Sequence, residues 1–97
     1  MIIITGGFTV KEGCMDQALA LSLKHVEHSR TERGCISHAV YRDSEAPLRL
    51  FFYEQWADKE AIEAHFAQAS SQAFVAGIRE LAADVPNLQM FSANKIN

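Results

Sequence analysis

Apolar positions along the chain follow two spacings, one typical of strands and one typical of helices. Residues 2–10 are rich in β-branched side chains and end near a glycine, which predicts a first strand. From residue 14 to residue 33 apolar side chains recur at helical spacing and Gly34 follows, which predicts a long first helix. Residues 35–41 and 48–56 flank a polar turn, which predicts a hairpin.

The second half of the chain predicts two shorter helices and a last strand. Asp58 is placed to cap the first of these helices, and Ser70 or Ser71 to cap the second, which Pro86 stops. Residues 88–96 form a final extended segment. The order β-α-β-β-α-β, with a split second helix, predicts an α+β ferredoxin-like plait in which helices cover one face of an antiparallel sheet.

The third predicted strand is apolar on both faces. Leu50 and Phe52 alternate with Phe51 and Tyr53, although the uncovered face of such a sheet is usually polar. One layer of helices covers only one face of the sheet. We therefore expect the other face to pack against a second copy of the chain in a homodimer.

Length and charge narrow the possible partners. Residues 1–97 suit a single domain. The 9 Lys and Arg residues against 12 Asp and Glu residues give a net charge of -3 without blocks of like sign, so no nucleic acid partner is expected. The N-terminal apolar run is too short for a signal peptide or a membrane span, which predicts a cytoplasmic protein with no membrane partner.

Two polar residues occupy positions where the pattern calls for apolar ones. Glu54 shares a strand face with Phe52 and Trp56, because side chains alternate along a strand. His65 follows Ile62 by three residues, which places it on the helix stripe that faces the sheet. We expect Glu54 and His65 to converge. Trp56 is expected to form one wall of a pocket that excludes water and binds a planar ligand. A purely structural interpretation, a hydrogen-bonded core histidine beside an anchoring carboxylate, stays open.

Four further polar residues carry less weight in the sequence analysis. His25, His28 and Glu32 share one helical face at a spacing that could hold a metal ion, but such a face is usually just solvated, so no metal is predicted. His38 lines the pocket if its side chain points toward the helices. The register of a strand cannot be read from sequence to one residue, so this stays undecided.

Two segments, GCISHAVYRD at 34–43 and FFYEQWADKEAIEAHF at 51–66, resemble the antibiotic biosynthesis monooxygenase domain family. The resemblance covers essentially the whole chain, and its most specific part is the spacing of Tyr53, Glu54, Trp56, Asp58, Ala61 and His65. It implies a dimeric α+β barrel built on the ferredoxin-like plait. The family includes quinol and polyketide monooxygenases that need no cofactor, an isomerase of phosphorylated autoinducer-2 and haem-degrading monooxygenases, and the fold does not choose among them.

Residues at matching positions separate these subgroups in part. Polyketide-oxidising members share the tryptophan matched by Trp56, but have asparagine where this chain has Phe52 and tyrosine where it has Ile62. Haem-degrading members need an axial histidine in the last helix, where this chain offers apolar residues, so haem is not expected. Quinol monooxygenases and the isomerase carry the pair matched by Glu54 and His65, although the isomerase pattern tends to have tyrosine in place of Trp56.

The resemblance implies cofactor-independent oxidation of a quinol, phenolic or polyketide-like aromatic compound by dioxygen. In this prediction His65 is the base, Glu54 holds its imidazolium, and Trp56 shields the reactive intermediate. The residues expected to contact substrate are Phe52, Phe66, His38 and Phe74. Two alternatives stay open: an isomerase of a phosphorylated autoinducer-like sugar, and a non-catalytic ligand-binding dimer, which a pocket filled by phenylalanine side chains would favour.

Overall fold

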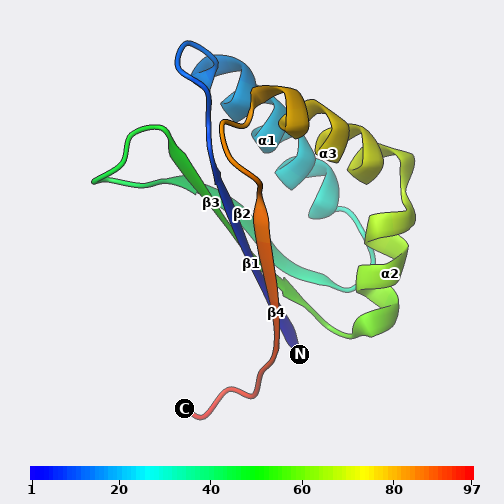
Figure 1. Cartoon of the computed structure of the whole chain (residues 1–97). Coiled ribbons are helices and arrows are strands. Elements are labelled where there is room, and N and C mark those ends of the chain that lie inside the picture. Colours follow the sequence, from blue (N-terminus) through cyan, green and yellow to red (C-terminus); the bar gives the residue numbers. More distant parts are fainter.

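The chain forms a four-stranded antiparallel sheet with three helices on one of its faces (Figure 1). The computed structural model describes all 97 residues. Its elements are β1 (Ile2–Thr9), α1 (Met15–Ser29), β2 (Cys35–Arg42), β3 (Arg49–Trp56), α2 (Lys59–Ala67), α3 (Ala69–Leu81) and β4 (Asn87–Ser92). The strand order is β2-β3-β1-β4. This arrangement confirms the predicted ferredoxin-like fold with its split second helix.

The register of the three adjoining strands β2, β3 and β1 sets which side chains face the helices. Glu54 of β3 pairs with Ile4 of β1 and with His38 of β2, and all three side chains are buried. Since paired residues in an antiparallel sheet point to the same face, His38 lies on the helix side together with Glu54. The register therefore decides the orientation of His38 that the sequence leaves open.

The apolar interior consists of two clusters, which are separated by polar residues at the position of Glu54 in the sheet. Phe8, Val10, Ala18, Val26, Leu50, Phe52 and Ile78 form the larger apolar cluster. Ile4, Trp56, Ala61 and Ile62 form a smaller one. Glu54 lies between Phe52 and Trp56 on the inward face of β3, so the polar site occupies the junction of the two clusters.

Two elements end earlier than the sequence predicts. The pattern predicts a first helix up to residue 33, but α1 ends at Ser29, whose hydroxyl donates a hydrogen bond to the carbonyl oxygen of His25 at 2.7 Å. The last strand ends at Ser92 rather than at residue 96. Early helix termination matters for the site, because the residues after Ser29 form a turn instead of a further helical turn.

The caps of the two shorter helices differ in how well they were predicted. Asp58 caps α2 as expected, since its side chain accepts a hydrogen bond from the backbone N–H of Ala61 at 2.9 Å. For α3 the prediction of Ser70 or Ser71 is wrong, because the helix begins after Gln68 and both serines lie in its first turn. Ser71 instead points inward, where its hydroxyl lies 3.5 Å from Nδ1 of His65.

The sheet face opposite the helices carries large apolar side chains. Tyr41, Phe51 and Phe91 remain about half exposed, and no helix covers this face (Figure 1). None of the helices combines the length and the apolar character that crossing a membrane requires.

Candidate functional site

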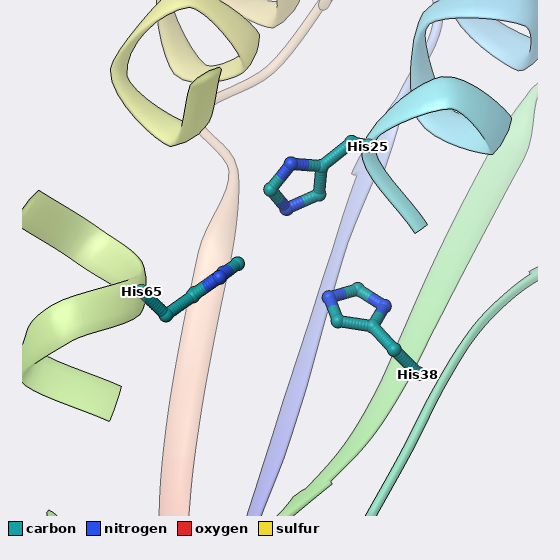
Figure 2. Close-up of side chains that lie close together, drawn as sticks. All are labelled: His25, His38 and His65. Atoms are coloured by element: carbon teal, nitrogen blue, oxygen red, sulfur yellow. The ribbon is translucent and has the colours of Figure 1, made fainter. Parts of the chain in front are cut away.

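Three histidines from three elements meet between the sheet and the helices. His25 comes from α1, His38 from β2 and His65 from α2, and their rings turn toward one another (Figure 2). One ring nitrogen of each lies within 4.8 Å of the corresponding nitrogens of the other two. We call these three residues the histidine cluster.

His65 is held by a carboxylate other than the predicted one. Its Nδ1 lies 2.8 Å from Oε1 of Glu32, and both side chains are buried. The sequence predicts that Glu54 and His65 converge, and they lie close enough to interact electrostatically, but the carboxylate in direct contact with His65 is that of Glu32. Because α1 ends at Ser29, Glu32 lies in the turn that follows it. This turn places the Glu32 carboxylate next to α2, where it contacts the imidazole of His65.

Glu54 contacts His38 and Trp56. The indole Nε1–H of Trp56 donates a hydrogen bond to Oε1 of Glu54 at 2.9 Å, and Nε2 of His38 lies 3.3 Å from the same oxygen. Burial alone would raise the pKa of Glu54, but the contacts with His38 and then with Trp56 outweigh it and hold the pKa below its ordinary value. Glu54 is therefore a buried, ionised carboxylate at neutral pH.

His25 is the third member of the cluster and packs on an aromatic ring. Its imidazole stacks on Phe74 with ring centres 4.0 Å apart and planes 3° from parallel. Burial first, and then the charges of His38 and His65, lower the pKa of His25 to about 4, so the ring is neutral at neutral pH. Its Nδ1 is buried without a hydrogen-bond partner, and so is Nδ1 of His38, whose other ring nitrogen has only the carboxylate of Glu54 beside it at 3.3 Å.

A cavity of about 340 Å³ opens beside the cluster. His25, His38 and Glu54 supply part of its polar lining, while Phe52 and Phe74 are among its apolar walls. This volume lies at the lower end of the range of roughly 300–1,000 Å³ that is usual for small-molecule sites. The cavity therefore has space for a compact ligand of about one aromatic ring.

The other predicted site residues lie around this cavity or outside it. His65 and Trp56 are buried behind its lining and do not face it. Phe66 is 39% exposed and borders a different hollow on the outer side of α2. It is therefore not a wall of the cavity beside the histidine cluster.

The residue that the sequence prediction missed is His25. The prediction groups it with His28 and Glu32, but the side chain of His28 is 48% exposed and its Nε2 bonds to Gln68. A signal was present: Ser22, His25 and Ser29 follow one another at helical spacing on the buried stripe of α1. Polar residues repeated along a stripe that should be apolar indicate a polar site within the core.

The sequence was compared with known families and structures. The model of the family described as antibiotic biosynthesis monooxygenase matches residues 1–77. The chain belongs to this family. The fold is retained at low sequence identity: a putative antibiotic biosynthesis monooxygenase from Deinococcus radiodurans has a TM-score of 0.94 at 18% identity, covering 100% of this chain and 96% of that one.

Three proteins illustrate the range of this similarity. An uncharacterized protein of Synechocystis is 30% identical over 90 residues, which make up 93% of this chain and 61% of that relative, so the chain spans about three-fifths of its length. A solved antibiotic biosynthesis monooxygenase structure has a TM-score of 0.90 at 23% identity and covers 98% of this chain and 100% of its own. A protein of unknown function from Bacteroides thetaiotaomicron has a TM-score of 0.87 at 26% identity, and the match covers 93% of this chain and 94% of that one.

Proposed function

We propose that this monooxygenase-family protein oxidises a small phenolic or quinol compound with dioxygen in the cavity beside the histidine cluster. The observation that carries the proposal is the cavity itself: aromatic walls lead to buried imidazoles without hydrogen-bond partners and to an ionised carboxylate. An apolar cleft with a few convergent polar groups is the usual form of a small-molecule site.

The cavity suits a planar ring that carries a hydroxyl group. Phe52 and Phe74 offer apolar surface to the ring, and His25, His38 and Glu54 offer polar atoms to the hydroxyl. The phenylalanine side chains do not fill the cavity. The filled pocket that would favour a non-catalytic dimer is therefore not the arrangement found.

His38 takes the role of proton acceptor in this proposal, instead of the predicted His65. His38 faces the cavity and His65 does not. Glu54, 3.3 Å from Nε2 of His38, stabilises the imidazolium that forms when the substrate hydroxyl loses its proton. The role predicted for Glu54 is kept, but it acts on a different histidine. Trp56 orients Glu54 through its hydrogen bond rather than touching the substrate.

The reaction balances without an external reductant. A quinol and one dioxygen molecule give a hydroxyquinone and one water, with one oxygen atom entering the ring and the other leaving as water. The quinol supplies all four electrons that reduce dioxygen. Loss of the hydroxyl proton makes the ring electron-rich enough to react with dioxygen.

Oxygen uptake with a panel of hydroquinones tests the proposal. The wild-type protein is expected to consume oxygen faster than the uncatalysed background, and His38→Ala is expected to lose roughly 10²–10⁴-fold in rate. Glu54→Gln keeps the shape of the side chain and is expected to lose about 10–100-fold, as outer carboxylates do. His28→Ala, an exposed histidine on the same helix as His25, is the matched control and should retain the wild-type rate.

Two results would contradict the proposal. One is oxygen uptake no faster than background for every hydroquinone in the panel, and the other is a wild-type rate in His38→Ala. Incubating the same protein with a phosphorylated ketose and following isomerisation then tests the second reaction, since a single proton acceptor serves both chemistries.

A further inference from the structure

We propose that the histidine cluster binds one divalent first-row transition-metal ion through His25, His38 and His65. This goes beyond the proposed oxidation and does not depend on it, because metal binding is measured on the protein without substrate. It also departs from the expectation of no metal, which considered a face of one helix only. The ligands of the proposed site come from a helix, a strand and a second helix.

The spacing of the three rings suits a single ion. Their ring nitrogens all lie within 4.8 Å of one another. With metal–nitrogen distances of about 2.0–2.1 Å in a tetrahedral site, each nitrogen needs to move by less than about 1 Å to reach a common centre. A displacement of this size is comparable to that of a small side-chain rotation.

Unpaired nitrogen atoms point to a ligand that the protein alone does not provide. Nδ1 of His25 and Nδ1 of His38 are buried with no hydrogen-bond partner, whereas Nε2 of His38 faces the carboxylate of Glu54 at 3.3 Å. Most buried polar atoms in folded proteins are paired, so two unpaired nitrogens on neighbouring rings need an explanation. An ion held by one lone pair from each ring removes part of this deficit.

Carboxyl groups stand behind two of the proposed ligands, as is usual for metal-binding histidines. Glu32 holds Nδ1 of His65 at 2.8 Å, which leaves Nε2 of that ring as its free nitrogen. Glu54 lies 3.3 Å from Nε2 of His38. Such carboxylates fix the orientation of the rings and raise their basicity, and two of them balance the charge of a divalent ion.

Three protein ligands leave one coordination position open. His25 and His38 also line the cavity, so a molecule bound in the cavity lies next to the proposed ion. Sites with three histidines and a free position belong to the reactive class, whereas structural sites are closed by four protein ligands. The proton transfer proposed for His38 then belongs to the metal-free protein, because a ring nitrogen that binds an ion cannot also accept a proton.

Titration of chelator-treated, full-length protein with Co²⁺ tests the site, with Zn²⁺ measured in competition with a chromogenic chelator. One ion per chain and the visible absorption of low-coordinate Co²⁺ are expected. His38→Ala and His65→Ala should each weaken binding by at least about 100-fold, more than the loss of an outer carboxylate causes. His28→Ala should leave the affinity unchanged, because its side chain is 48% exposed and outside the cluster.

A measurement on the wild-type protein keeps the test decisive if a variant does not fold. Paramagnetic Co²⁺ should give the imidazole NMR signals of the histidine cluster the large contact shifts of directly bound ligands, and those of His28 only a smaller through-space shift. The proposal is overturned if no ion binds at stoichiometric concentration, if only the His28 signals respond, or if binding survives His38→Ala. Oxygen uptake by stripped and loaded protein, recorded in parallel, reports separately on the proposed oxidation.

Discussion

The side chains of the histidine cluster weaken the fold that holds them. A buried polar atom left without a hydrogen bond costs about 1–3 kcal/mol, and His25 and His38 contribute such atoms to the interior. Residues of this kind persist where function requires them, and the remainder of the core compensates. The cluster should therefore show a conflict between stability and function.

Replacing His25 by phenylalanine measures this conflict. The new ring is flat like the imidazole that stacks on Phe74, although somewhat larger, and it removes the unpaired Nδ1. We expect His25→Phe to raise the free energy of unfolding of the metal-free protein by about 1 kcal/mol in urea titrations with chelator present. His28→Phe, at an exposed position, should give no gain. A variant less stable than wild type would contradict this interpretation.

At the level of single residues, sequence reasoning identified the unusual side chains but not their partners. Glu54 and His65 stood out because each interrupts an apolar pattern, and both are buried. The exchange of partners, with Glu32 on His65 and His38 beside Glu54, depends on where a turn and a strand register place residues far apart in sequence. Neither the path of the turn nor the register of the strand can be read from the local periodicity of the sequence.

Among the elements, the turn between α1 and β2 determines how α2 approaches the site. Gly34 has a φ of +84°, a conformation that side chains with a Cβ rarely adopt, and a Cβ at this position would overlap the Cβ of Ala61 in α2. The same turn carries Glu32, the partner of His65. Close contact between this turn and α2 therefore keeps Glu32 and His65 next to each other.

Comparison of two glycine variants isolates this contact. Gly13 has a φ of +81° but nothing within 4 Å of an added Cβ, so Gly13→Ala should lose only about 1–2 kcal/mol of unfolding free energy. Gly34→Ala should lose a further 1–3 kcal/mol or so, because α2 must shift. Denaturant unfolding of both variants gives the difference. Equal losses of unfolding free energy in the two variants would show that the contact between Gly34 and α2 does not contribute to stability.

The elements themselves were predictable because each has a clear apolar period and recognisable ends. Asp58 before α2 is an example of a cap that acts as the sequence indicates. The end of α1 at Ser29 was not predictable from periodicity, because every residue between Val26 and Gly34 is polar and no apolar position marks where the helix stops.

For the whole molecule, the apolar sheet face without helices predicts a homodimer. Tyr41, Phe51 and Phe91 are each more than 40% exposed on this face. Sedimentation equilibrium at micromolar concentration should give twice the 10.8 kDa mass of the chain. Phe51→Asp should shift the protein toward monomer, while Leu23→Asp, at an exposed apolar position on α1, should not. A wild-type monomer at this concentration would contradict the prediction.

The proposed oxidation is tested most directly by following the oxygen atoms. Wild-type protein is incubated with a hydroquinone under ¹⁸O₂, and the product is reduced at once and analysed by mass spectrometry. The proposal predicts a hydroxylated product with one ¹⁸O atom in each molecule, formed faster than in buffer and lost in His38→Ala. Product without the label, or labelled product formed equally fast by His38→Ala, would contradict oxidation at the histidine cluster.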